Sequence, residues 1–372
     1  RPQPGGSAAA RDRMAVPVDG ADGAAELAAA IAEHKDNIET AGAAPFRDSI
    51  APNVNLPWWV QSSPHTSLAT LKSSGIGIYA AANWNEAATK YGAAFTYNNV
   101  PHTKLIFGPG THCAWSFVKN ETGFDIVTEE LRFFDYWLKG VKNGVMEEPG
   151  VTYYTYNAAP GTEWRQSKTW PLANEKRTDF FLGAGTLASS APSAPAKDAT
   201  GINGSLAPMT STTAPERAAD EQKLVYETPT LNADMQITGH PVVHLWLSTA
   251  SPDVDVIAYL EDVAPDGKAT AYNMHGQLRA SRRALSEAPY NALGLPWHSH
   301  LAKDAKPLAA NQPEDLAFDL LPISYIFKAG HKVRLTLTFT DVDRKENKSI
   351  VNVLRAPATA SRLTLPIIPA DS

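Results

Sequence analysis

The residues whose types and spacing could support catalysis lie in two polar clusters, each directly after an apolar run. Glu86 ends the cluster Asn83-Trp84-Asn85-Glu86, and His112 ends the cluster Gly108-Pro109-Gly110-Thr111-His112. A serine hydrolase needs a base that takes the proton of its nucleophile and an acid that fixes the tautomer of that base. Glu86 and His112 could fill these roles, because acid then histidine is the second half of a triad whose chain order is nucleophile, acid, histidine.

The nucleophile of such a triad is missing from the sequence. No G-x-S-x-G pattern occurs in the 372 residues. Cys113 follows His112 directly, but neighbouring residues on an extended loop point in opposite directions, so we interpret Cys113 as a small filler residue. A single cysteine also excludes an internal disulfide and a cysteine-based zinc site.

Two short strands must present these clusters. The apolar run from Ile76 to Tyr79, with the alanines that follow it, and the run from Lys104 to Phe107 are both predicted to be strands. A helix-sized segment separates them. Because polar residues that follow parallel strands meet at the carboxyl edge of the sheet, we expect the acid and the histidine to lie together there.

Helices are predicted on both sides of these strands. The first covers residues 19–37, and a second runs from His65 to Gly75, where the glycine ends it. A third covers residues 122–139 with Thr122 as its cap. The apolar residues of this third helix recur at helical spacing and are expected to pack against the sheet. They are Ile126, Leu131, Phe134 and Leu138.

Beyond Pro149 the sequence changes to short alternating or β-branched runs without intervening helices. Val242–Leu247 and Val254–Leu260 are two of these runs, and Pro265-Asp266-Gly267 is typical of a hairpin turn. Such a series predicts an antiparallel β-sandwich of the jelly-roll type. Residues 183–223, rich in Ala, Ser, Thr, Pro and Gly, are expected to form a long surface excursion within it.

The composition limits the partners of the chain. Hydrophobic residues make up 43% of it, enough for two or three domains with their own cores. The net charge of −6 and the lack of Lys/Arg runs argue against nucleic acid or an anionic membrane as a partner. No apolar run approaches the roughly 20 residues of a membrane-spanning helix. The chain starts at Arg1 without a targeting segment, so we expect a soluble protein, with secretion or a periplasmic location left open.

Two further clusters have the composition of metal sites. Calcium would suit four carboxylates, but a solvated strand edge and a turn account for them. Zinc would suit the spacing of His298 and His300, but no third ligand is evident, so we interpret this stretch as a loop. We therefore expect neither a metal nor an organic cofactor. The four carboxylates are those of Asp253, Asp255, Asp262 and Asp266.

The whole arrangement resembles the CocE/NonD-type α/β-hydrolases, a group that includes cocaine esterase, X-prolyl dipeptidyl aminopeptidase, glutaryl acylase and α-amino acid ester hydrolase. In that family the acid lies in a G-G-W-x-D pattern and the histidine in a G-P-W-x-H pattern. Alignment on Trp84 places Glu86 at the family's aspartate and His112 at its histidine. The runs 238–249 and 327–335 are similar to the family's C-terminal jelly-roll domain.

Two departures from the family pattern concern the site. Glu86 is one methylene longer than aspartate, and Asn85 is an alternative orienting group. Asn83 stands in place of a glycine and Gly110 in place of a tryptophan, which we expect to open or reshape the pocket. The resemblance covers essentially the whole chain but only the C-terminal part of the family's architecture.

The resemblance implies a fold of α/β plus all-β type in three parts. Residues 1–74 are expected to form a lead-in and a helical cap, residues 75–148 the last strands and helices of an α/β-hydrolase sheet, and residues 149–372 the jelly-roll sandwich. The implied activity is that of a serine hydrolase that cleaves a carboxylic ester or a small amide through an acyl-enzyme. Glu86 and His112 would come from this chain, and the nucleophilic serine from a missing N-terminal part or a separate chain.

The sequence leaves a second class of function open. The chain could be a non-catalytic remnant or a scaffold protein that uses its sandwich for binding. The oligomeric state is also open. Several aromatic residues are assigned to the substrate pocket, with packing as the alternative: Trp84, Trp58, Trp59, Trp115 and Phe117.

Overall fold

The computed structural model describes residues 16–37, 40–52, 55–87, 89–204, 222–271, 273–343 and 345–370. The chain divides into two units, one formed by Arg1–Pro64 with His300–Ala302 and the other by His65–Ser299 with Lys303–Ser372. In the described part of the chain, no helix combines the length and the apolar character needed to cross a membrane.

The smaller unit consists of short elements. The predicted helix over 19–37 is confirmed in its central part as α2, and Asp22 is its N-cap residue, although its side chain accepts no capping hydrogen bond. The two strands of this unit pair antiparallel. The elements are α2 (Gly23–Glu33), η1 (His34–Asp36), α3 (Thr40–Ala43), β1 (Ile50–Ala51), β2 (Leu56–Pro57) and α4 (Trp58–Gln61).

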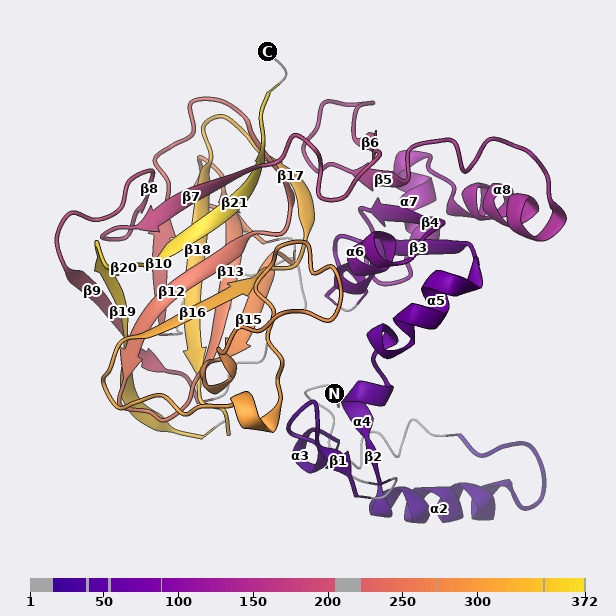
Figure 1. Ribbon diagram of the computed structural model, residues 1–372, viewed down its shortest axis with the longest axis horizontal. Coiled ribbons are helices and arrows are strands. Elements are labelled where there is room, and N and C mark those ends of the chain that lie inside the picture. Colours follow the sequence, from indigo (N-terminus) through magenta and orange to yellow (C-terminus); the bar gives the residue numbers. More distant parts are fainter. Residues whose placement is uncertain are drawn as a thin grey trace. The chain divides into compact units, whose positions relative to one another are not determined.

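The larger unit contains a four-stranded sheet in the order β3-β4-β5-β6. Both predicted strands are confirmed, as β3 (Ile78–Asn83) and β4 (Thr103–Gly108), and they are parallel with the last residue of one opposite the last residue of the other. α6 (Lys90–Asn99) connects them. β5 (Val151–Tyr154) extends the sheet in parallel and β6 (Trp164–Ser167) antiparallel (Figure 1).

The helices around this sheet differ in detail from the prediction. The segment from His65 to Gly75 forms η2 (Pro64–Ser67) and α5 (Leu68–Ser74), which ends at Gly75 with a left-handed φ of 67°. The predicted helix over 122–139 is confirmed as α8 (Ile126–Lys139), and a further helix, α7 (Trp115–Thr122), precedes it. Asp125 caps α8 by accepting a hydrogen bond from the amide of Val127, whereas Thr122 belongs to the helix before.

The apolar face predicted for α8 is only partly correct. Ile126 is buried, but Leu131, Phe134 and Leu138 are exposed in the described structure. The buried aromatic residue is Phe133, whose ring packs edge-on against Tyr79 of β3 at 5.3 Å. Ile126 and Phe133 are seven residues apart and share a face, while the other three lie on a second apolar face that no described residue covers.

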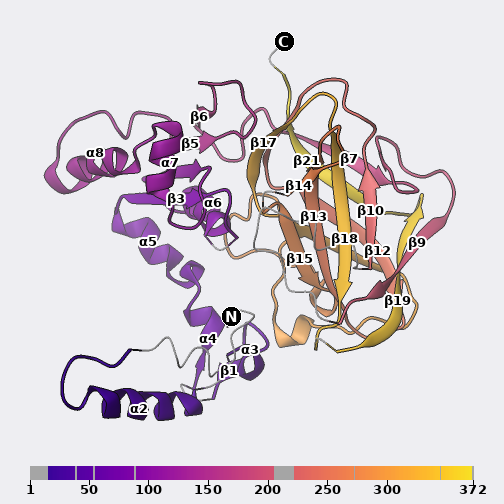
Figure 2. The same cartoon turned by 180° about the vertical axis from the view of Figure 1, so that it is seen from behind.

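The strands beyond β6 form two antiparallel sheets, seen from opposite sides in Figures 1 and 2. Two short 3-10 helices, η4 (Ala280–Arg282) and η5 (Ala302–Asp304), lie in their connections. The five-stranded sheet contains β10 (Lys223–Glu227), β13 (Asp255–Val263), β14 (Ala269–Thr270), β15 (His275–Arg279) and β18 (Lys332–Thr340). The ten-stranded sheet contains β7 (Lys176–Leu182), β8 (Leu187–Ala188), β9 (Ala196–Ile202), β11 (Met235–Gly239), β12 (Val242–Thr249), β16 (Glu314–Asp319), β17 (Ile323–Phe327), β19 (Asn347–Ala356), β20 (Thr359–Ala360) and β21 (Arg362–Ile368).

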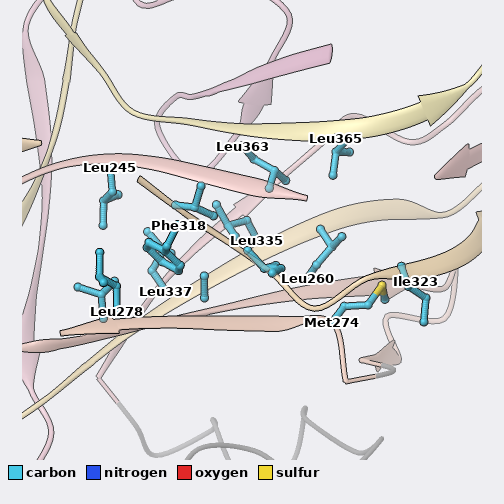
Figure 3. Close-up of a cluster of buried hydrophobic side chains, with 14 of the residues drawn as sticks. Leu245, Leu260, Met274, Leu278, Phe318, Ile323, Leu335, Leu337, Leu363 and Leu365 are labelled. Atoms are coloured by element: carbon cyan, nitrogen blue, oxygen red, sulfur yellow. The ribbon is translucent and has the colours of Figure 1, made fainter. Parts of the chain in front are cut away.

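One hydrophobic core joins the two sheets. Leu245 and Leu363 come from the ten-stranded sheet, and Leu260 and Leu335 come from the five-stranded sheet (Figure 3). The expected strand-rich β domain after the α/β part is therefore confirmed. The surface excursion expected over 183–223 instead contains β8 and β9, which pair within the ten-stranded sheet, while residues 205–221 of it lie outside the described residues.

The boundary predicted at residue 149 does not separate the sheets. The range predicted for the sandwich includes β5 and β6, but β5 pairs with β4 and β6 pairs with β5. The chain then passes directly into the sandwich, because the amide of Tyr156 donates to the carbonyl of Ser324 at 3.0 Å and the amide of Ile326 donates back to Tyr156 at 3.0 Å. Hydrogen-bond pairing, which composition does not report, decides to which sheet a strand belongs.

Candidate active site

The ends of β3 and β4 bring the two polar clusters together. The amide of Trp84 donates to the carbonyl of Gly108 at 2.7 Å, and the amide of Asn85 donates to the carbonyl of Gly110 at 3.1 Å. The parallel pairing thus continues beyond the strands into both loops. Glu86 and His112 follow at the same edge of the sheet, as the sequence predicts.

The acid and the histidine are in direct contact. Nδ1 of His112 lies 2.6 Å from Oε2 of Glu86, although 26 residues separate them. The side chain of Glu86 is only 4% exposed, whereas that of His112 is 63% exposed. A buried carboxylate therefore holds one ring nitrogen, and the other, Nε2, has no hydrogen-bond partner among the described residues. This is the arrangement by which an acid fixes the tautomer of a general base.

The second oxygen of the acid is also held. Oε1 of Glu86 accepts hydrogen bonds from the amide of Thr89, at 3.0 Å, and from the hydroxyl of the same residue. Thr89 is the N-cap residue of α6, so the carboxylate lies at the positive end of that helix. These contacts fix the position of the carboxylate. The extra methylene of glutamate is accommodated in this turn.

Asn83 connects the acid strand to the histidine loop. Its Oδ1 accepts from the amide of Gly110 at 3.0 Å, and its Nδ2 donates to the carbonyl of Thr111 at 3.1 Å. A Cβ on Gly108 would lie 2.5 Å from this Oδ1, and one on Gly110 would lie 3.1 Å from it. We expected the exchange of residues at 83 and 110 to open the pocket. Instead the side chain of Asn83 occupies the space beside Gly108 and Gly110, which have no side chains.

Lys90 and Asn273 complete the surroundings of the acid, and neither role was predicted from the sequence. Lys90 is fully buried, and its Nζ donates to the carbonyls of Trp84, at 2.7 Å, and of Asn273, at 3.2 Å. Burial lowers the pKa of Lys90 to about 7, while the charge of Glu86 acts in the opposite direction. Nδ2 of Asn273 donates to Oδ1 of Asn85 at 2.7 Å. Asn85, the alternative orienting group, is therefore engaged away from the histidine.

Trp84 packs in the core and does not face a substrate pocket. It is completely buried, its ring stacks on Phe107 with a centroid distance of 4.2 Å, and its Nε1 donates to the carbonyl of Tyr154 at 2.6 Å. The packing alternative thus holds for this residue. Trp115 is half-buried and covers Gly108, where a Cβ would lie 2.8 Å from its ring. Phe117, in the same helix, is exposed and remains available for substrate contact.

Trp58 and Trp59 lie in the smaller unit. Their exposed fractions are 38% and 39%, and Nε1 of Trp59 donates to the carbonyl of Ala44 at 2.7 Å. Half-exposed aromatic rings in a short helix suit either a packing role or a wall over a substrate. Their contact with a substrate stays a prediction.

Cys113 is exposed and has a left-handed φ of 56°, so it lies in a turn and not on the extended loop that we expected. The residues considered as metal ligands have protein partners. Asp253 accepts from the amide and hydroxyl of Ser281. Asp262 is buried rather than solvated. It contacts Tyr325 and His331.

The described parts of the chain contain no group of three or more His, Cys, Asp or Glu side chains that could hold a metal ion. His298, one of the two histidines considered as zinc ligands, is buried, and its Nε2 lies 2.9 Å from the carbonyl oxygen of Ala317. The remaining carboxylates of the proposed calcium set are also engaged. Asp255 pairs with Arg279, and Asp266 accepts from the amide of Lys268.

Comparison with known proteins finds relatives over most of the chain. The family model of the X-Pro dipeptidyl-peptidase C-terminal non-catalytic domain matches residues 143–347. A Mycobacterium bovis protein named as a serine esterase is 30% identical over 386 residues, which cover 91% of this chain and 61% of the relative. The chain belongs to the CocE/NonD hydrolase family.

Other CocE/NonD proteins extend the comparison. Cocaine esterase from Rhodococcus is 24% identical over 314 residues, or 71% of this chain and 51% of the enzyme. The crystal structure of a CocE/NonD family hydrolase from Staphylococcus aureus superposes with a TM-score of 0.69 at 19% identity, over 92% of this chain and 59% of that chain. This CocE/NonD chain therefore spans about half to three fifths of the length of the curated relatives it matches.

Proposed function

We propose that this chain supplies the acid and the general base of a serine hydrolase that cleaves a carboxylic ester or a small amide through an acyl-enzyme. The contact of 2.6 Å between Glu86 and His112 carries the proposal. The names of the relatives, a serine esterase and a cocaine esterase, support the reaction class. The proposal includes the jelly-roll topology of the sandwich, which two packed antiparallel sheets support.

Each residue has a defined role in the proposed reaction. Nε2 of His112 takes the proton of the serine hydroxyl as the oxygen attacks the carbonyl carbon, and then gives that proton to the leaving group. In deacylation the same nitrogen takes a proton from water and returns it to the serine. Glu86 keeps the proton of the imidazole on Nδ1 and stabilises the cation that forms in each step.

The nucleophilic serine is assigned to a segment other than this chain, either an N-terminal part or a separate polypeptide. Two features of the larger unit support this assignment. β3 is the edge strand of its sheet in the described structure, with an open row of backbone groups. Beside this sheet, α8 exposes an apolar face that includes Leu131, Phe134 and Leu138. A further parallel strand with its own helices would cover both.

The test uses the protein as isolated from its natural source, with intact mass, N-terminal sequencing and labelling by a fluorophosphonate. A labelled polypeptide that contains G-x-S-x-x-G and accompanies or continues into this chain supports the proposal. In that complete protein, His112→Ala should abolish hydrolysis of a p-nitrophenyl ester. His102→Asn is the control, because His102 is exposed with a φ of 57°, which asparagine tolerates.

Two results would overturn the proposal. One is a species of about 40 kDa, the mass of this chain, that is neither labelled nor active. The other is a labelled protein in which His112→Ala keeps the activity of the control. The first result would favour the scaffold alternative, and the second would move the base to another residue.

A further inference from the structure

Lys90 is a fully buried lysine beside the four-stranded sheet, and its position has no explanation in the triad alone. It begins α6, and its Nζ contacts two carbonyl oxygens, one in the turn that carries the acid and one in the sandwich. A buried ammonium group costs several kcal/mol when it has no charged partner, so such a residue is retained only where its hydrogen bonds matter. Because a neutral amine still has two N–H groups, both contacts persist when the proton is lost.

Asn273 is the partner from the sandwich. It lies between β14 and β15, is buried, and has a left-handed φ of 52°, a conformation that asparagine adopts more readily than most residues. Its backbone carbonyl accepts from Lys90, and its side-chain Nδ2 donates to Asn85. One residue of the sandwich therefore contacts both the lysine and the residue before the acid.

The turn from Trp84 to Glu86 is consequently held at three successive positions. Lys90 binds the carbonyl of Trp84, Asn273 binds the side chain of Asn85, and Thr89 binds Oε1 of Glu86. Only Oε2 of the acid remains, and it faces His112. The contacts of Lys90, Asn273 and Thr89 therefore set the direction in which this oxygen points. The contact from Asn273 comes from the sandwich.

We propose that Lys90 and Asn273 are positioning residues for the acid–histidine pair, so that the sandwich takes part in setting the geometry of the site. This inference rests on the proposed function, because it assigns a purpose to the contact between Glu86 and His112. It gives a role in the reaction to a domain whose family description reads non-catalytic.

The test measures the tautomer of His112 in this chain and needs no serine. Imidazole ¹⁵N spectra are recorded with labelled histidine at pH 8, above the pKa of about 6.5 of a free histidine side chain. The chain has 10 histidines, and His112→Ala identifies the relevant signal. In the wild type the proton should lie on Nδ1, held by Glu86. His331, whose Nδ1 lies 2.8 Å from Asp262 in the sandwich, reports in the same spectrum that the variant is folded.

Two variants remove the contacts from different sides. Lys90→Met keeps the apolar stem and removes the amine. Asn273→Gly keeps the left-handed backbone and removes only the amide that binds Asn85. In each, the Nδ1–H signal of His112 should be lost in favour of the Nε2–H form that free imidazole prefers. Lys104→Met is the matched control, because Lys104 also holds two backbone carbonyls, those of Glu148 and Pro149, away from the acid.

The outcomes separate this inference from the function on which it rests. If wild-type His112 does not carry its proton on Nδ1, the acid–histidine pair itself fails. If the wild type does and both variants keep that signal, the pair stands and the positioning role is overturned. If only one variant loses the Nδ1–H signal of His112, the positioning role belongs to the residue changed in that variant and not to the other residue. If Lys90→Met loses the His331 signal through misfolding, Asn273→Gly decides.

Discussion

The side chain of Asn83 holds the backbone of Gly110, with Oδ1 of the asparagine 3.0 Å from the amide nitrogen of the glycine. The asparagine ends β3 and the glycine lies two residues before His112, so this contact joins the strand of the acid to the loop of the base. A larger residue at 110 would meet Val118 and the asparagine at once. The two positions therefore fit each other as a pair.

Asn83→Ala is expected to lower the kcat of the complete enzyme roughly 10-fold to 100-fold, because a partner that orients a site residue is commonly worth this much. It leaves the buried amide of Gly110 without its acceptor, which should also lower the free energy of unfolding by about 1–3 kcal/mol. Steady-state kinetics and urea unfolding measure the two effects. Asn98→Ala, which removes a side-chain contact within α6, should change kcat little. Equal kinetics in both variants would show that the loop does not need Asn83.

Glu86→Gln is expected to reduce ester hydrolysis about 10²-fold to 10⁴-fold in the complete enzyme, since an amide cannot hold the imidazole in the same tautomer or stabilise its cation. Glu86→Asp should retain more activity, because aspartate keeps the negative charge and is shorter by only one methylene group. The measurement is kcat/KM with a p-nitrophenyl ester. Near-wild-type turnover in Glu86→Gln would move the role of the acid to another residue.

Trp84→Phe should destabilise the chain without changing substrate affinity. The variant loses the stack on Phe107 in part and leaves the carbonyl of Tyr154 without its donor, so the free energy of unfolding should fall by about 2–4 kcal/mol. Denaturant unfolding measures the change, and Trp58→Phe, at a partly exposed position, should stay within about 0.5 kcal/mol. A raised KM with unchanged stability would instead return Trp84 to the substrate pocket.

His275 should make the fold sensitive to acid. Burial, and to a lesser extent the charge of Lys90, lowers the pKa of His275 to about 4. An unfolded chain binds this proton near pH 6.5, so between 6.5 and 4 the unfolded state binds more protons and the free energy of unfolding falls as the pH falls. His275→Gln should remove about 2–3 kcal/mol of this fall, as measured by unfolding at pH 7 and pH 4. The exposed His34→Gln is the control, and equal pH dependence in both would refute the assignment.

The sequence was sufficient to predict those site residues that directly follow a recognisable strand pattern. Glu86 and His112 follow two short apolar runs, and the parallel pairing of β3 and β4 brings them together as expected. Lys90 and Asn273 could not be found in this way. A lysine at the start of a helix is ordinarily solvated, and only the three-dimensional fold shows that residue 273, far along the chain, covers it.

Packing partners explain the other differences. The apolar residues of α8 occur on two faces, and helical spacing does not say which face meets the sheet. β5 has the composition of a sandwich strand, because parallel and antiparallel partners accept the same β-branched and aromatic residues. In each case the sequence predicts the helix or strand, but its packing or pairing partner is a segment distant in the sequence.

The backbone hydrogen bonds between Tyr156 and the strand β17 have a consequence for dissecting the protein. The last parallel strand of one sheet runs into the edge of the other without a linker, and buried hydroxyls of Thr155 and Ser324 lie 2.9 Å apart beside the junction. A gene fragment cut at residue 149 would remove β5 and β6 from the sheet they complete. Amide exchange should accordingly show that the four-stranded and the ten-stranded sheet open together, as a single cooperative block.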